Sequence, residues 1–168
     1  MLLGALPDQA EGDYGWIEPA RHESGRESRS VLRFVEKPSR AHACELMAHG
    51  ALWNTFVFAA QATTLWAMVR QTAPDLADAF ERLCRILSLR SSYASSFTEY
   101  AYERMRAVNF SSGVCEPLVS WLRVLPLPDV GWSDWGTAER IVASLQHLGK
   151  LDACLARLRH GRQGDSPL

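Results

Sequence analysis

The sequence predicts an α/β fold in which a mixed sheet is flanked by helices. Short apolar runs that end at proline or glycine alternate with stretches in which apolar residues recur at helical spacing. A chain of 168 residues suits one domain, and neither an internal repeat nor a linker interrupts it. Strands that alternate with helices in this way are typical of layered α/β domains.

Five strands are expected, over residues 1–6, 16–19, 31–35, 51–60 and 121–126. Pro7 ends the first strand, and Pro38 follows the third because proline cannot donate to a central ladder. The fourth strand is strongly apolar and aromatic, which predicts burial on both of its faces. Residues 8–15 and 20–30 are polar and rich in turn formers, as in loops.

Helices are expected from about residues 39, 74, 97, 137 and 151, and another contains Leu65, Met68 and Val69 on one face. Ser39 is a suitable N-cap for the first, and Gly50 is a suitable end. The apolar residues that repeat after Pro74 predict core packing rather than a ligand-binding stripe. Residues 88–96 and 109–112 are polar and are expected as a loop and a turn. We expect one domain over residues 1–160, followed by a frayed tail over 161–168.

Composition narrows the function. Net charge is −1 and the isoelectric point is about 6.5, so the chain lacks the basic field of a nucleic-acid binder. No apolar run reaches the roughly 20 residues of a membrane span, and the start lacks the basic leader of a signal peptide. We therefore expect a cytoplasmic protein that binds neither nucleic acid nor membranes.

Four cysteines lie 31 to 40 residues apart, at positions 44, 84, 115 and 154. This spacing fits neither a compact zinc site nor a small disulfide scaffold. We expect free thiols, most of them buried.

Charged side chains follow the third strand. Glu36 and Lys37 are neighbours at a strand end, so their side chains are expected to point in roughly opposite directions. The carboxylate suits a sugar hydroxyl and the ammonium suits a phosphate. The alternative is a solvated charge pair with no ligand.

Asp134 lies between two tryptophans in a loop that precedes a helix. Its carboxylate is a suitable hard ligand for Mg²⁺, which takes one or two carboxylates and completes its shell with phosphate and water. Aspartate also favours helix N-caps, so that role is the alternative. Asp129 is a second candidate, although an exposed turn explains it equally well.

Asn54 lies inside the apolar fourth strand, where an unpaired amide costs about 1–3 kcal/mol. It therefore needs neighbouring backbone groups or a ligand hydroxyl as partners. The five histidines form no motif, and the sequence has neither Gly-x-Ser-x-Gly nor His-Glu-x-x-His. Hydrolase chemistry has no support.

Five segments occur in an order and rough spacing that resemble sugar-1-phosphate nucleotidyltransferases, above all mannose-1-phosphate guanylyltransferases. They are Gly-Asp-Tyr-Gly-Trp-Ile-Glu (12–18), Phe-Val-Glu-Lys-Pro (34–38), Gly-Ala-Leu-Trp-Asn-Thr-Phe-Val-Phe (50–58), Asn-Phe-Ser (109–111) and Val-Gly-Trp-Ser-Asp-Trp-Gly-Thr (130–137). The resemblance covers about residues 1–145. It implies a mixed, mostly parallel, Rossmann-like sheet with flanking helices.

In that family a sugar 1-phosphate attacks the α-phosphate of a nucleoside triphosphate, which gives a nucleotide sugar and pyrophosphate. By resemblance, Gly15 approaches the sugar through its backbone, Glu36 binds sugar hydroxyls, Lys37 holds the sugar phosphate, Asn54 lines the pocket and Asp134 binds Mg²⁺. The implied substrates are mannose 1-phosphate and GTP, and the implied product is GDP-mannose.

The family's Gly-x-Gly-Thr-Arg loop and the lysine that follows it have no counterpart here, because Lys37 and Lys150 are the only lysines. Thr55 and Trp135 stand where the best-known members carry smaller residues. We therefore expect an incomplete catalytic domain that lacks the N-terminal nucleotide-binding half and is inactive alone. The alternative is a non-catalytic sugar-phosphate-binding module that a partner chain completes along exposed sheet edges, or a homo-oligomer.

Overall fold

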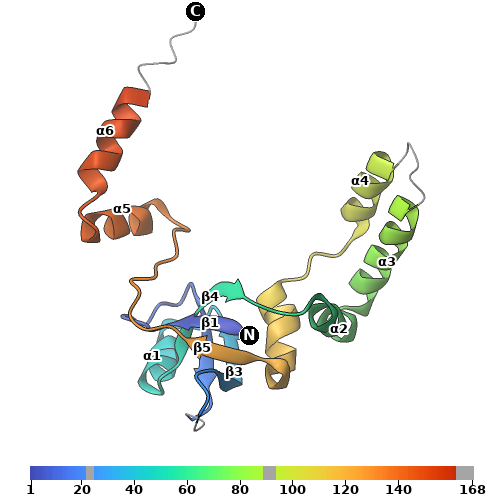
Figure 1. Cartoon of the computed structure of the whole chain (residues 1–168), viewed down its shortest axis with the longest axis horizontal. Helices are drawn as coiled ribbons and strands as arrows, with labels where there is room; N and C mark the ends of the chain where they lie inside the picture. Colours follow the sequence, from blue (N-terminus) through green and yellow to red (C-terminus); the bar gives the residue numbers. More distant parts are fainter. Residues whose placement is uncertain (22–24, 89–93, 162–168) are drawn as a thin grey trace, which may run out of the picture. The chain divides into compact units, whose positions relative to one another are not determined.

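The computed structural model describes residues 1–21, 25–88 and 94–161 (Figure 1). The chain divides into two compact units, Met1–Val130 and Gly131–Leu168. Each unit is described separately below.

The strands of the first unit form one small, closed sheet. They are β1 (Leu2–Ala5), β2 (Gly15–Pro19), β3 (Arg29–Glu36), β4 (Leu52–Phe58) and β5 (Arg123–Pro126). Their order is β1-β4-β2-β3-β5, and β5 pairs with both β3 and β1 to complete a barrel. All five expected strands are present, and β3 begins two residues earlier than predicted.

The sheet is mixed, as predicted, but the expectation of a mostly parallel, Rossmann-like sheet is wrong. Within the described residues only β1 and β5 pair in parallel, and every other pairing is antiparallel. The reason is the position of β2. Strands β3 and β4 are connected through a helix and run in the same direction, but β2 lies between them and pairs antiparallel with both.

Helices of the first unit follow the predicted order. They are α1 (Arg40–Ala48), α2 (Ala62–Thr72), α3 (Pro74–Ser88) and α4 (Ala94–Arg104). The hydroxyl of Ser39 accepts a hydrogen bond from the backbone N–H of His42 at 3.3 Å, so the predicted cap is confirmed. Gly50 follows α1 with a φ of 76°, a conformation that favours glycine.

Residues 111–121 are helical, which the sequence did not predict. A π-helical segment, η1 (Ser111–Cys115), continues into a 3₁₀ segment, η2 (Glu116–Trp121). Asn109 stabilises the start of this segment, since its Oδ1 accepts a hydrogen bond from the backbone N–H of Ser112 at 3.0 Å. Serine, glycine and proline disfavour helix in this stretch. Tertiary packing overrides that preference, because η1 and η2 supply three residues of the core.

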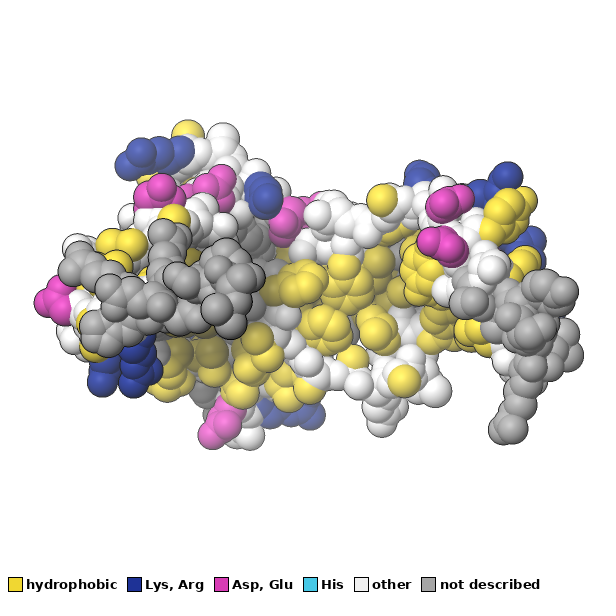
Figure 2. Space-filling view, turned by 90° about the horizontal axis from the view of Figure 1, so that it is seen from above, with side chains coloured by type: hydrophobic (Ala, Val, Ile, Leu, Met, Phe, Trp, Pro, Cys, Tyr) yellow, Lys and Arg dark blue, Asp and Glu magenta, His cyan; other side chains and the backbone are white. Residues whose placement is uncertain are grey.

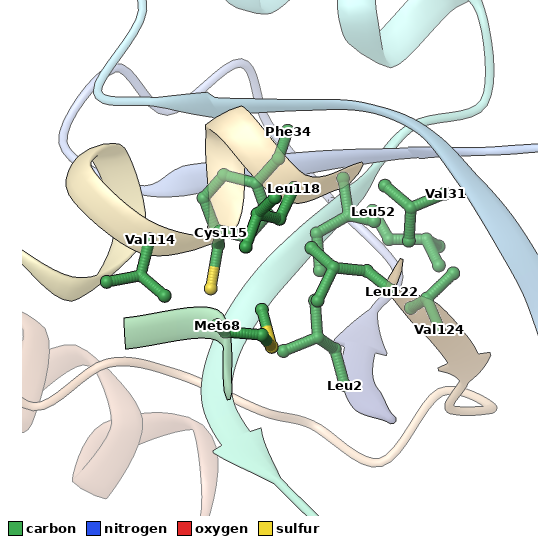
Figure 3. Packing of buried hydrophobic residues seen from close by; sticks show 11 residues of the cluster. Leu2, Val31, Phe34, Leu52, Met68, Val114, Cys115, Leu118, Leu122 and Val124 are labelled. Atoms are coloured by element: carbon green, nitrogen blue, oxygen red, sulfur yellow. The ribbon is translucent and has the colours of Figure 1, made fainter. Parts of the chain in front are cut away.

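The core of the first unit lies inside the barrel and against α2, η1 and η2 (Figure 3). Its members are Leu2, Ile17, Val31, Phe34, Leu52, Met68, Val114, Cys115, Leu118, Leu122 and Val124. Trp16, Ile17 and Val124 are the largest side chains that are fully buried in the described part of the chain.

Strand β4 is buried only in its first half, so the prediction of burial along its whole length is wrong. Residues 52–55 are buried, whereas Phe56, Val57 and Phe58 are exposed. Phe56 has a φ of 58°, and this left-handed residue separates the two halves. The rings of Phe58 and Phe110 stack with centroids 5.3 Å apart. Figure 2 shows apolar side chains across the middle of one face of the molecule.

The four cysteines are free thiols, as predicted, but only Cys115 is buried. Cys44 and Cys84 are exposed and Cys154 is partly exposed, so the prediction that most are buried is wrong. The two exposed thiols lie on α1 and α3 next to buried positions, Ala43 and Leu83, and therefore on the outer faces of these helices.

The second unit contains α5 (Ala138–His147) and α6 (Leu151–Gly161), which confirms the two helices expected from residues 137 and 151. Between them Gly149 has a φ of 62°. The predicted frayed tail covers residues 161–168. Gly161 is the last residue of α6, and residues 162–168 lie outside the described residues. The predicted domain of residues 1–160 stays a prediction. Among residues 1–21, 25–88 and 94–161, no helix has the length and apolar character needed to cross a membrane.

Candidate functional site

Three of the residues predicted to bind a ligand lie together on three adjacent strands. Gly15 on β2 is paired with Glu36 on β3, and Asn54 lies on β4, the other neighbour of β2. A Cβ atom placed on Gly15 would lie 2.8 Å from Glu36 Oε2 and 3.4 Å from Asn54 Nδ2. The carboxylate and the amide therefore flank the same point of backbone, and only glycine leaves that point open.

Asn54 is 9% exposed and its two polar atoms have different surroundings. Its Oδ1 accepts a hydrogen bond from the backbone N–H of Phe56 at 3.1 Å. A neighbouring backbone group is therefore the partner of the oxygen, which is one of the two predicted alternatives. Within the described residues its Nδ2 donates no hydrogen bond. The amide nitrogen on the Gly15 side is thus available to an acceptor.

Glu116 holds the backbone of Glu36 in place. Its Oε1 accepts a hydrogen bond from the backbone N–H of Glu36 at 2.7 Å. Glu116 is the first residue of η2 and Glu36 is the last residue of β3. Sequence reasoning missed this residue. The two positions are 80 residues apart, and no local pattern near Glu116 indicates such a contact.

Cys115 reports the charge around this pair of glutamates. Burial, followed by the negative charges of Glu36 and Glu116, raises the pKa of its thiol to about 11. The thiol is therefore neutral near pH 7. Carboxylates such as these two suit hydroxyl groups as ligands, whereas a phosphate needs a cation nearby.

Lys37 directly follows Glu36 and is the basic residue nearest to it in the sequence. It is exposed, follows β3 with a φ of 48°, and its backbone N–H donates to Tyr14 O at 3.2 Å. Within the described residues Lys37 and Phe56 are the only non-glycine residues with positive φ. Both lie within two positions of a site residue, and strained backbone of this kind clusters at functional sites.

Buried aromatic rings support the site. Tyr14 packs edge-on against Trp53 with ring centroids 5.0 Å apart, and Trp16 packs edge-on against the same ring at 6.3 Å. The indole N–H of Trp16 donates to Glu11 O at 2.8 Å. Each ring neighbours Gly15 or Asn54 in sequence, so the strands that carry these residues are firmly positioned.

Asp134 belongs to the second unit and is therefore described apart from the three strands. Its Oδ2 lies 3.3 Å from Arg140 Nη1, in an ion pair whose carboxylate side chain is 45% exposed. A Cβ on Gly136 would lie 2.9 Å from the same oxygen. The helix-cap alternative is wrong for Asp134, because the Thr137 hydroxyl caps α5 by accepting from Arg140 N at 3.3 Å.

The acidic and cysteine or histidine side chains form no obvious metal cage. In the parts of the chain that the structure covers, no three such residues come together. Asp129, the second candidate ligand, is exposed. Asp134 is thus a single carboxylate, which is the number that Mg²⁺ accepts when phosphate and water complete its shell.

The chain is similar to known proteins over most of its length. The family model for nucleotidyl transferases matches residues 1–150. The chain belongs to the nucleotidyl transferase family. The resemblance drawn from five short segments is thereby confirmed.

Curated relatives carry related names. The chain is 27% identical over 151 residues to mannose-1-phosphate guanylyltransferase 2 of Escherichia coli O157:H7, a match that covers 82% of this chain and 29% of that protein. It is 25% identical over 142 residues to mannose-1-phosphate guanylyltransferase of Sinorhizobium fredii, which covers 84% and 27%. The chain thus spans less than a third of the length of these relatives.

Solved structures agree on the fold. A Thermus thermophilus protein titled mannose-1-phosphate geranyltransferase superposes with a TM-score of 0.60 at 30% identity, over 74% of this chain and 34% of that chain. A mannose-6-phosphate isomerase from Helicobacter pylori gives 0.59 at 20% identity, over 79% and 50%. The second likeness indicates the fold alone.

Proposed function

We propose that the chain binds the sugar 1-phosphate of a nucleotidyltransferase reaction, with mannose 1-phosphate and GTP as substrates and GDP-mannose and pyrophosphate as products. The observation that carries this proposal is the meeting of Glu36 and Asn54 around Gly15. The names of the relatives supply the choice of sugar and base.

Each residue has a role that its chemistry supports. The Glu36 carboxylate accepts hydrogen bonds from sugar hydroxyls, and the Asn54 amide nitrogen donates one to a hydroxyl oxygen. Gly15 has no side chain, so the sugar approaches the backbone between them. Lys37 neutralises the sugar phosphate as a compact charge.

The reaction needs positioning and charge neutralisation more than covalent catalysis by the protein. A phosphate oxygen of the sugar 1-phosphate forms a bond to the α-phosphorus of GTP, the bond between the α- and β-phosphates breaks, and pyrophosphate leaves with its electrons. A sugar that is fixed by Glu36 and Asn54 holds its phosphate in one orientation for this attack.

Asp134 is the residue that we propose as a ligand of Mg²⁺. Its partly exposed carboxylate and its loop before α5 suit a hard cation, and Arg140 is a competing partner that must give way. When bound, Mg²⁺ supplies charge neutralisation to the phosphates. Asp134→Asn should weaken Mg²⁺ binding, measured by calorimetry with the metal alone, and unchanged binding would contradict this assignment.

Calorimetric titration with mannose 1-phosphate tests the sugar site. We expect Glu36→Gln to weaken binding at least about tenfold, because hydrogen bonds to a charged group contribute about 1.5–3 kcal/mol. Glu45→Gln is the matched control, since Glu45 is exposed on α1 and lies outside the site. Equal affinity of the wild-type chain and the Glu36→Gln variant would overturn the proposal.

A further inference from the structure

A cavity of about 480 Å³ lies between α3 and α4 and shares no lining residue with the sugar site. The two helices run side by side in Figure 1. Most of its wall is apolar, made largely by small or aliphatic side chains together with the rings of Phe97 and Tyr100. Its volume is in the range of cavities that hold small organic ligands, about 300–1,000 Å³.

Three arginines give this apolar cavity a positive charge. Arg82 comes from α3, Arg104 ends α4, and Arg106 follows it. Asp75 is the only acidic side chain among the described lining residues. Three guanidinium groups against one carboxylate leave a net positive field at the wall.

Within the described part of the chain, Arg82, Arg104 and Arg106 form no ion pair with a carboxylate, whereas Arg85, on the same helix as Arg82, pairs with Glu81 at 3.8 Å. The Arg104 guanidinium instead lies over the Tyr100 ring, 4.3 Å from its centroid. The cavity therefore places three cations beside aromatic rings, with Asp75 as the one carboxylate among its described lining residues.

We propose that this cavity binds a nucleoside phosphate, meaning a planar aromatic ring that carries phosphate groups. Guanidinium groups bind phosphate oxygens in a bidentate manner, which gives the charged end of the ligand its partners. The apolar wall with Phe97 and Tyr100 receives a planar ring by edge or offset stacking. An uncharged sugar satisfies neither feature, and pyrophosphate satisfies only the first.

This site is additional to the proposed sugar site, and the inference does not depend on that proposal. The two sites can be tested separately because each has its own ligand. Mannose 1-phosphate reports on Glu36 and Asn54, whereas a nucleotide without the sugar reports on the arginines.

Calorimetric titration of the chain with GDP, guanosine and inorganic pyrophosphate tests the inference. We expect GDP to bind more tightly than either component, and we expect Arg82→Glu and Arg104→Ala each to weaken GDP binding at least about tenfold by removing a charge-assisted contact. Arg85→Glu is the matched control, because it reverses the same charge on the same helix outside the cavity, and GDP affinity should stay the same. Hydrogen exchange should show protection by GDP at residues 73–82 and 97–106.

Two outcomes overturn the inference. One is the absence of GDP binding to the wild-type chain. The other is a GDP affinity in Arg82→Glu equal to that of Arg85→Glu, with both variants giving the circular dichroism spectrum of the wild type. In either case mannose 1-phosphate titrated into the same samples shows separately whether the sugar site functions.

Discussion

Replacing Gly15 with alanine is the sharpest test of the sugar site, because one methyl group enters the point where its residues meet. The added Cβ would lie 2.8 Å from Glu36 Oε2 and 3.2 Å from Asn54 Cβ. The first distance is shorter than real Cβ contacts allow. The Glu36 carboxylate must therefore move, and it can do so because it is the end of a flexible side chain. Asn54 needs to shift by only a few tenths of an ångström.

The free energy of unfolding should change little. Alanine in a strand gains about 0.5–1 kcal/mol over glycine, and Gly15 lacks the positive φ that would strain a side chain. The tight contact with Asn54 costs a similar amount, since mild overpacking is worth about 1 kcal/mol or more. We therefore expect a net change within about 1 kcal/mol.

Binding of mannose 1-phosphate should weaken much more. A displaced Glu36 loses hydrogen bonds to sugar hydroxyls that are worth about 1.5–3 kcal/mol, which corresponds to roughly 10- to 100-fold in affinity. Urea unfolding measures the stability and calorimetry measures the affinity.

A double variant shows whether the methyl group acts through the carboxylate. If it does, Gly15→Ala combined with Glu36→Gln binds no more weakly than Glu36→Gln alone, because the same interaction is lost once. Full additivity of the two effects, or wild-type affinity in Gly15→Ala, would refute the reasoning.

Four further predictions concern stability and reactivity. Gly4→Ala should destabilise the chain by about 1–3 kcal/mol in urea unfolding, because its Cβ would meet core side chains at 2.7 and 2.9 Å that cannot move away; an unchanged midpoint would contradict the packing. Glu116→Ala should lower the free energy of unfolding by about 1–2 kcal/mol through loss of the acceptor for the Glu36 N–H, and Glu116→Gln should restore part of it; identical curves for both variants would argue against this contact. Since burial and the neighbouring carboxylates raise the pKa of Cys115 to about 11, its thiol stays protonated at pH 8, and iodoacetamide should modify it far more slowly than Cys44 until the pH approaches 11. Rapid alkylation of Cys115 in the native chain at pH 8 would contradict this. The same shift predicts stability that falls as pH rises from about 9 to 11, because the unfolded thiol ionises first; a free energy of unfolding that stays constant over that range would contradict it.

Local signals in the sequence predicted most elements. Pro7, Ser39 and Gly50 mark ends that the structure places within a residue or two, because capping and proline chemistry act over a few residues. The π- and 3₁₀-helical turns after Asn109 were missed for the opposite reason. Their formation depends on burial of Val114 and its neighbours in a core assembled from distant strands.

The candidate site was predictable in part. Glu36 and Asn54 stood out as polar groups at the end or inside of apolar strands, and the strand order brings both beside Gly15. Strand order itself is a long-range property, which is why the direction of the pairings was predicted wrongly. Glu116 could not be found at all, since its hydrogen bond to the Glu36 N–H joins residues that are 80 positions apart.

Closure of the barrel also limits how the chain can associate with others. Each of the five described strands already has a neighbour on both sides, so none of them presents a full row of unpaired amides to an incoming strand. A second molecule that docks on this sheet must therefore recognise side chains, and the exposed rings of Phe56 and Phe58 in the second half of β4 are among those available. Growth of the sheet into ribbons or fibres by edge-to-edge addition would first require one of the strand pairings that close the barrel to open.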